Sequence, residues 1–337
     1  MNILIRADGN SKIGLGHVSR CISLALELET LGAEVYFLAR KNEIVRNFLD
    51  EHNINYYLFE FDSIKKEISF ITNFVNKNNI QKGIFDSYEL NSNECYMYSI
   101  HDISNFSVIC IEGYKKYPIQ ADVIINPNLF AKDRLELYDP SQSKLLFGPE
   151  YALLRPIYNK VEEKNNQFNN KVLVTFGGGD VKGLTLPVVK SLLEIDNIKI
   201  DVVVGPYAEK KETIKKISKD NTNLNYYYNL TNLLDRYIQA DICVCAAGST
   251  VLELIKFNIP ILTYSVADNQ KLVAKKVEEL RLGYNLGQAE EFCEDRLKTK
   301  IIEILNNKRQ YKKFLMNCEN MINSNTTRKV AEEIMKK

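Results

Sequence analysis

The chain has 337 residues, of which 45% are hydrophobic and 26% charged, and its formal net charge is +1. This length suits two domains of ordinary size, and the composition is typical of a soluble globular protein with a substantial core. The near-neutral charge argues against a nucleic-acid-binding protein, which is usually strongly basic overall or in one block.

The start of the chain and its cysteines narrow the class further. The apolar run at residues 2–7 is too short for a signal peptide, and no segment is apolar over the length needed to span a bilayer. We therefore expect a cytoplasmic protein with no stable membrane insertion. The seven cysteines contain no C-x-x-C pair, which argues against a zinc or redox site, and we expect all seven to be small buried hydrophobes.

Stretches typical of strands and helices alternate through the first half of the chain. Residues 2–7 predict a buried strand, and residues 17–32 predict a helix because apolar residues recur there at three- and four-residue spacing. Such alternation predicts a parallel sheet covered by helices. Further strands are predicted at 33–40, 56–61, 82–88, 106–113 and 121–128, and further helices at 43–53 and 63–79.

The pattern starts again after a polar, linker-like stretch at residues 164–171. We therefore expect two doubly wound α/β domains of Rossmann type, at residues 1–158 and 170–337, each binding ligands beyond the carboxyl ends of its strands. Strands are predicted at 171–180, where the strand runs into a glycine turn, and at 198–205, 224–229, 241–249 and 259–265. Helices are predicted at 184–196, 212–220, 230–240, 250–258 and 269–281, and the remainder is predicted to be helical.

The stretch GLGH, at residues 14–17, is the first motif that suggests chemistry. Gly14 and Gly16 permit a tight turn and a close approach of the backbone to a ligand, and His17 falls in the first turn of the following helix. The positive helix end favours a pyrophosphate or a developing oxyanion, and it favours the neutral imidazole that a general base needs. The alternative is a surface histidine without a functional role.

Two glycine-rich turns in the second half follow predicted strands. In FGGGD, the backbone N–H groups of Gly177 and Gly178 would face an anion, or the turn is purely structural, and Asp180 would cap the next helix. In AAGSTVLE, the turn at Gly248 and the hydroxyls of the next two residues would hold phosphate oxygens. Those hydroxyl-bearing residues are Ser249 and Thr250.

Three further polar positions lie at or near strand ends. Glu253 follows the second glycine turn and would accept hydrogen bonds from a ribose, or it would complete a capping box with Ser249 or Thr250. Asn269 and Gln270 belong to the cluster ADNQ after another strand and should face the same ligand. Asp86 ends a strand of the first half, where it would orient His17 or bind substrate, or simply cap its own loop.

In chain order, the segments IRADGNSKIGLGHVSRC, DSY, FGPEYALLRP, FGGGD, AAGSTVLEL and ADNQ resemble the nucleotide-sugar hydrolases of pseudaminic acid biosynthesis. This family is related to the spore-coat polysaccharide protein G group and is similar to the glycosyltransferase that makes lipid II. The resemblance covers nearly the whole chain. It implies a GT-B fold, in which two Rossmann-like domains face each other across a cleft.

The resemblance also implies an activity. Family members cleave UDP from a UDP-2,4-diacetamido-2,4,6-trideoxyhexose by attack of water on the sugar C1. His17 would activate that water, Glu253 would bind the ribose, and Asn269 and Gln270 would touch the sugar or phosphate. The other substrate-contacting residues that the matched motifs imply are Gly14, Gly16, Arg20 and Tyr88 in the first half, and Gly177, Gly178, Asp180, Gly248, Ser249 and Thr250 in the second.

The chain departs from the family pattern on the sugar side. It has Ser87 where a histidine is often found, and Glu112 and Gly113 where two aspartates are usual. The alternative functions are a GT-B glycosyltransferase that uses the same nucleotide site, and an inactive protein that binds a sugar nucleotide. We expect a small-molecule nucleotide-sugar ligand, no metal, no cofactor and no nucleic acid, and the oligomeric state stays open.

Overall fold

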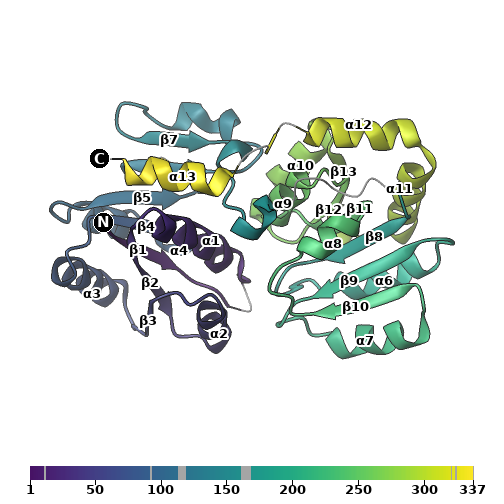
Figure 1. Cartoon of the computed structure of the whole chain (residues 1–337), viewed down its shortest axis with the longest axis horizontal. Coiled ribbons are helices and arrows are strands. Elements are labelled where there is room, and N and C mark those ends of the chain that lie inside the picture. The colour runs from purple at the N-terminus through teal and green to yellow at the C-terminus, as the bar shows by residue number, and fades with distance from the viewer. Residues whose placement is uncertain are drawn as a thin grey trace. The chain divides into compact units, whose positions relative to one another are not determined.

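The computed structural model describes residues 1–10, 13–91, 93–112, 119–160, 168–319, 321–322 and 325–336. The chain divides into two compact units (Figure 1). Unit 1 contains Met1–Asn10, Leu15–Pro156 and Ser324–Lys337, the last of which includes the helix α13 (Thr326–Met335). Unit 2 contains Ser11–Gly14 and Ile157–Asn323. None of the helices within these described ranges is long and apolar enough to cross a membrane.

Unit 1 is a seven-stranded parallel sheet with the strand order β3-β2-β1-β4-β5-β6-β7. The chain builds outward from β1 in one direction to β3 and then returns to place β4 on the other side of β1. This reversal is the switch point at which sheets of this kind bind ligands. The strands are β1 (Asn2–Ala7), β2 (Glu34–Arg40), β3 (Tyr56–Phe59), β4 (Lys82–Asp86), β5 (Ser107–Ile111), β6 (Val123–Asn126) and β7 (Lys144–Phe147).

Helices cover both faces of this sheet. Alternate residues of β1 enter opposite cores: Ile3 and Ile5 pack with one set of helices, and Leu4 packs with the other. All three are fully buried, as expected for a strand covered on both faces. The first set is α1 (Gly16–Thr30), α2 (Glu43–Glu51) and α13, and the second is α3 (Ile64–Lys77) and α5 (Glu94–His101).

Unit 2 is a six-stranded parallel sheet with the order β10-β9-β8-β11-β12-β13, and its switch point lies between β8 and β11. Its strands are β8 (Lys171–Thr175), β9 (Lys199–Val204), β10 (Leu224–Tyr228), β11 (Ile242–Ala246), β12 (Ile261–Ser265) and β13 (Gly283–Gln288). Its helices are α6 (Thr185–Leu193), α7 (Lys211–Asp220), α8 (Leu234–Gln239), α9 (Thr250–Lys256), α10 (Lys271–Glu279), α11 (Glu294–Asn306) and α12 (Lys308–Cys318).

The end of the chain differs from the prediction, which assigned residues 170–337 to the second domain. Helix α13 belongs to unit 1, where Val330 and Ile334 are buried in the same core as α1. Thr326 Oγ1 donates to Ala152 O at 2.6 Å, and Thr327 Oγ1 donates to Leu154 O at 2.6 Å. The short-range pattern predicted the helix but carried no information about which core it would enter.

The prediction of an all-helical end after residue 281 is wrong, because β13 pairs with β12 in parallel. The strand GYNLGQ lacks β-branched residues, and only Gly283 and Leu286 are buried in it, so its local signal is weak. Gly283 is required by close packing, since a Cβ there would lie 1.8 Å from Ile261 O. The prediction that every cysteine is buried also fails for Cys95 and Cys293, which are exposed next to the starts of α5 and α11.

Candidate functional site

The polar residues of GLGHVSR meet the end of β4 at the switch point of unit 1. Ala7, the last residue of β1, pairs with Asp86, the last residue of β4. The chain after β1 leads into α1, which begins at Gly16 and places His17 in its first turn. Arg20 lies one helical turn further on, so both side chains reach the end of β4. Strand order and helix spacing together explain why residues far apart in sequence meet here.

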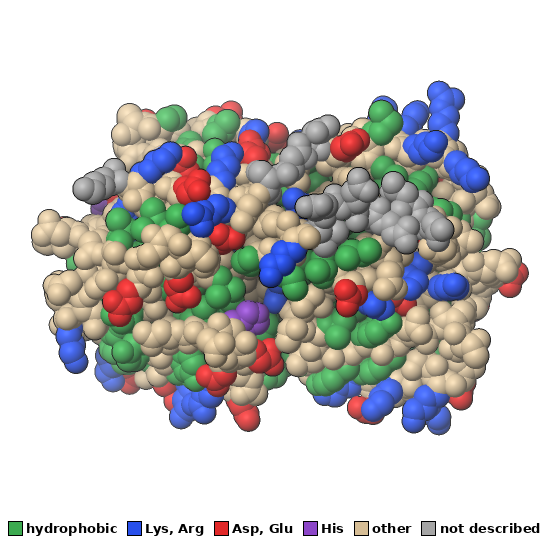
Figure 2. All heavy atoms as spheres, viewed as in Figure 1, with side chains coloured by type: hydrophobic (Ala, Val, Ile, Leu, Met, Phe, Trp, Pro, Cys, Tyr) green, Lys and Arg blue, Asp and Glu red, His purple; other side chains and the backbone are tan. Residues whose placement is uncertain are grey.

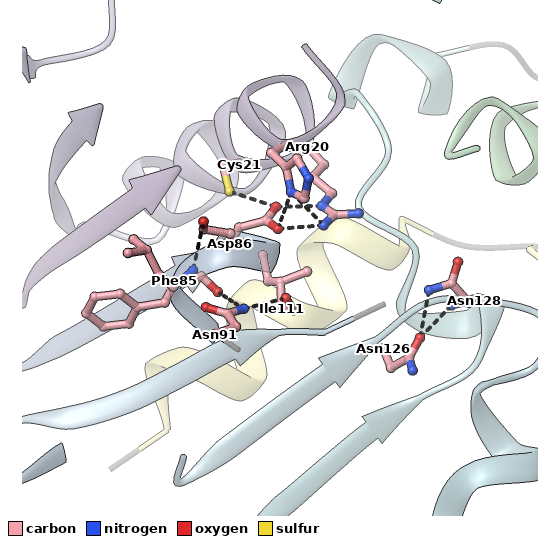
Figure 3. A network of polar contacts seen from close by, with 11 residues as sticks. Arg20, Cys21, Phe85, Asp86, Asn91, Ile111, Asn126 and Asn128 are labelled. Atoms are coloured by element: carbon pink, nitrogen blue, oxygen red, sulfur yellow. Dashed lines mark hydrogen bonds and ion pairs between the residues drawn. The ribbon is translucent and has the colours of Figure 1, made fainter. Parts of the chain in front are cut away.

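Asp86 is the centre of this group. Asp86 Oδ1 lies 2.6 Å from His17 Nδ1. Arg20 donates to both carboxylate oxygens of Asp86 at 2.5 Å (Figure 3). Cys21 Sγ donates to Asp86 Oδ2 at 3.4 Å from the next position of α1 (Figure 3). His17 is 6% exposed and Asp86 1% exposed. The carboxylate is therefore removed from water and held from several directions.

The charge of Asp86 fixes the proton on His17. Burial alone would raise the pKa of Asp86, but the adjacent Arg20 and His17 hold that pKa well below its usual range. An ionised carboxylate cannot donate, so the contact of 2.6 Å requires a proton on His17 Nδ1. In the neutral imidazole, Nε2 then carries the lone pair. This is the tautomer that a general base needs.

The start of α1 itself offers backbone donors. No described side chain caps this helix, and its first turn contains no acidic residue. Its amide N–H groups are thus oriented towards any negative charge that arrives there. Gly14 has a φ of +72°, a conformation that side chains disfavour, so the glycine is needed for the turn. Tyr88 begins the short helix α4 (Tyr88–Asn91), and its side chain lies outside the described part of the structure.

A second polar group continues along the same sheet edge, at the ends of β5 and β6. Glu112 is 3% exposed and accepts from Asn126 Nδ2 and from the Tyr138 hydroxyl, each at 3.3 Å. Asn126 Oδ1 accepts from both the backbone N–H and the side chain of Asn128, as drawn in Figure 3. Sequence reasoning noted Glu112 but missed its partners. The available signal was the polar segment after the strand that ends at Asn126.

In unit 2, the glycine turn after β8 is tightly packed at the backbone level. Gly177 has a φ of +72°, and Gly178 O accepts from Tyr207 N at 3.0 Å. A Cβ on Gly205 would lie 2.4 Å from Gly178 Cα, so Gly205 must also lack a side chain. The turn is thus held in place by the chain after β9, a contact that sequence reasoning did not predict.

Asp180 faces the start of α6. Its carboxylate accepts from Leu184 N at 2.8 Å and from Thr185 N at 3.1 Å. Burial raises the pKa of Asp180, although these hydrogen bonds oppose the shift. The geometry is that of a helix cap, which is the structural role that the sequence allowed for this residue.

The small-residue turn after β11 leads into α9 without a capping box. Ser249 is the cap position, yet no described side chain caps the helix, so the capping alternative for Glu253 is not formed. Instead, Glu253 Oε2 accepts a hydrogen bond from the hydroxyl of Tyr237, which is fully buried. Burial raises the pKa of Tyr237 well above its usual value, so the hydroxyl keeps the proton that it donates.

Gln270 joins this turn to the end of β12. Its Oε1 accepts from Val266 N at 3.0 Å, and its Nε2 would lie 3.7 Å from a Cβ on Gly248. Asn269 lies in the same short 3₁₀ helix, Asp268–Gln270. The structure therefore brings the AAGST and ADNQ segments together at one edge of unit 2. In the described ranges, no group of three or more His, Cys, Asp or Glu side chains is placed to hold a metal ion.

Two doubly wound parallel sheets, each with its polar residues at the switch point, define a GT-B protein. The chain belongs to the family of the glycosyltransferase family 28 C-terminal domain, whose model matches residues 158–334. That match contains the glycine turns, Glu253 and the ADNQ segment. The GT-B fold class that the resemblance implied is confirmed.

Known proteins resemble the chain over most of its length. It is 27% identical to an uncharacterized protein of Methanocaldococcus jannaschii over 77% of this chain, and it spans 55% of that protein. It is 24% identical to the UDP-2,4-diacetamido-2,4,6-trideoxy-beta-L-altropyranose hydrolase of Campylobacter jejuni, over 84% of this chain and all of that protein. The crystal structure of Acinetobacter baumannii MurG matches with a TM-score of 0.70 and 15% identity, covering 100% of this chain and 99% of that one.

Proposed function

We propose that the protein hydrolyses a UDP-linked 2,4-diacetamido-2,4,6-trideoxyhexose to free sugar and UDP, with inversion at C1, in nonulosonic acid or surface-glycan biosynthesis. The observation that carries the proposal is the His17–Asp86–Arg20 group, in which a buried, ionised carboxylate lies 2.6 Å from His17 Nδ1 and leaves Nε2 as the basic nitrogen of a neutral imidazole. The similarity to the Campylobacter jejuni hydrolase supplies the substrate class.

In the proposed reaction, a water molecule attacks the sugar C1 on the face opposite the diphosphate. His17 Nε2 accepts the water proton as the new C–O bond forms. The bond from C1 to the diphosphate oxygen breaks, and its electron pair leaves with UDP. Asp86 stabilises the imidazolium that forms, and Arg20 keeps Asp86 ionised throughout.

Unit 2 is proposed to bind the nucleotide. Backbone amides of the turns at Gly177–Gly178 and Gly248–Ser249 would take the diphosphate charge as it develops. Glu253, oriented by Tyr237, would accept from a ribose hydroxyl. Asn269 and Gln270 would contact the sugar or a phosphate oxygen from the neighbouring strand end.

The test is release of UDP from a panel of UDP-linked diacetamido sugars with no acceptor present. His17→Asn should lower kcat by about 10²–10⁴-fold, the usual contribution of a general base. His101→Asn is the matched control, because His101 is exposed on α5 and contacts Asp122 at 3.5 Å. Full turnover by His17→Asn, or equal loss in both variants, would contradict the assignment of the base.

A glycosyltransferase is the second candidate, and the family match favours it directly. The same base would then deprotonate a sugar or lipid hydroxyl in place of water. Tight UDP binding without UDP release, followed by release when an acceptor is added, would identify this activity. Binding that no acceptor converts into turnover would identify an inactive sugar-nucleotide-binding protein.

A further inference from the structure

Unit 2 contains a pocket of about 520 Å³ that the proposed reaction does not use. It opens at the start of β13, whereas the glycine turns follow the carboxyl ends of β8 and β11, so the two sites lie at opposite edges of one sheet. A volume of this size suits a small metabolite. The lining comes from the end of α10, the start of β13 and the start of α12, and it includes Glu278, Arg281, Tyr284, Arg309, Gln310 and Lys313.

The charges of the lining are unbalanced. Arg281, Arg309 and Lys313 form no ion pair with any described residue, and Glu278 is the single acidic residue among the described lining. Figure 2 shows Lys and Arg side chains gathered where α12 lies. The whole chain carries a net charge of only +1, so this excess of positive charge is local.

The pocket wall is held in place by its own hydrogen bonds. Gln310 donates to the Tyr284 hydroxyl, which donates to Glu303. The Tyr284 ring packs edge-on against Phe314, with 5.6 Å between ring centroids. The aromatic wall is thus oriented before any ligand arrives, which lowers the cost of ordering it on binding.

The backbone at Arg281 is unusual for this chain. Nine described non-glycine residues have a positive φ; seven are asparagines, and the others are Asp180 and Arg281, the latter at +54°. Asparagine tolerates this conformation far better than arginine does. Asn317 Nδ2 donates to Arg281 O at 2.9 Å, which ties the end of α10 to α12. The chain keeps arginine at a strained position beside the pocket, and such strain concentrates at ligand sites.

We propose that this pocket binds a phosphate-bearing anion, as a second site separate from the nucleotide site. Two guanidinium groups can each bind a pair of phosphate oxygens, and the Lys313 ammonium adds a compact charge. The shared chemistry fits a free phosphorylated metabolite or the headgroup of an anionic lipid. The proposal does not depend on the hydrolase activity.

The test uses hydrogen exchange of the full chain in the presence of inorganic pyrophosphate, because this readout locates the bound anion. Pyrophosphate should slow exchange of amides in residues 278–284 and 307–314. The pocket variant is Arg309→Ala/Lys313→Ala, and the matched control is Lys308→Ala/Lys312→Ala. The control removes the same charge from the same helix at positions that do not line the pocket.

The proposal is supported if the pocket variant loses this protection and its dissociation constant for pyrophosphate rises at least tenfold. In the control variant, that dissociation constant should change less than threefold. Protection only near the glycine turns, or equal loss in both variants, would overturn it. Vesicles containing phosphatidylglycerol distinguish the sources: sedimentation with these vesicles, reversed by pyrophosphate, identifies a lipid headgroup. Failure to sediment, with pyrophosphate binding intact, identifies a free metabolite.

Discussion

The two sheet edges of this protein use different chemistry at equivalent places. At the switch point of unit 1, the side chains of His17, Arg20 and Asp86 contact one another, and His17 and Asp86 are buried. At the switch point of unit 2, glycines such as Gly177 and Gly178 expose backbone between strand and helix. We propose that the same topology supports proton chemistry in one unit and anion binding by the backbone in the other.

Among the variants considered, Asp86→Asn should cause the largest loss of activity. An amide in place of the carboxylate removes the reason for the proton on His17 Nδ1 and leaves Arg20 without its counter-charge. We expect kcat for UDP release to fall by about 10²–10⁴-fold, while the affinity for UDP changes less than threefold. Steady-state kinetics measure kcat, and titration with UDP measures the affinity. A fall in UDP affinity as large as the fall in kcat would contradict the proposed division of catalysis to unit 1 and nucleotide binding to unit 2.

The same variant should change how stability depends on pH. The pKa of Asp86 is lower in the folded chain than in the unfolded one, so its ion pairs stabilise the protein above about pH 4. That stabilisation is lost as the pH falls below about 4 towards the lowered pKa. We expect the free energy of unfolding of the wild type to fall by about 1–3 kcal/mol more than that of Asp86→Asn between pH 5 and pH 2. Denaturant titrations at each pH measure this free energy. The expectation would be contradicted if the free energy of unfolding fell by the same amount in both proteins over this pH range.

Gly205→Ala should act on unit 2 alone. The added methyl would meet Gly178 Cα and the carbonyl oxygens of Gly177 and Gly178 at about 2.5 Å, so the glycine turn must move. We expect the dissociation constant for UDP to rise about tenfold, equivalent to ~1.4 kcal/mol, with kcat at saturation within threefold of wild type. A dissociation constant for UDP equal to that of the wild type would show that this close approach is unimportant.

The smallest effect should come from Tyr237→Phe, which removes the donor to Glu253. We expect UDP to bind about three- to tenfold more weakly, because a hydrogen bond to a charged group is worth about 1.5–3 kcal/mol and only part of that concerns the ligand. Tyr264→Phe is the control, since that buried hydroxyl has no hydrogen-bond partner in the described structure. It should leave UDP affinity unchanged and leave the thermal midpoint equal or higher.

Much of the unit 1 site could be predicted from sequence, because strand ends and helix starts of a doubly wound sheet converge. That rule alone brought Asp86 to His17. Arg20 is predicted to contact substrate, and the structure adds its two hydrogen bonds to Asp86, which the sequence did not predict. Its role depends on side-chain direction, which a motif does not encode.

Other parts depended on long-range packing that local patterns do not contain. Tyr237 reaches Glu253 only because α8 and α9 are neighbours in the folded unit. Strand β13 is defined by pairing with β12 and not by its own residues. Helix α13 was predicted as a helix, but its place in unit 1 depends on a core formed by residues some 300 positions earlier in the sequence.

The most direct test of the account is hydrolysis in ¹⁸O-labelled water with a UDP-linked diacetamido sugar and no acceptor. If water attacks C1, the label should appear in the anomeric hydroxyl of a sugar with inverted configuration, and the released UDP should carry none. The His17→Asn protein should form this product at about 10²–10⁴-fold lower rate. Label in the UDP, retained configuration, or no release from the wild type would contradict the proposed reaction.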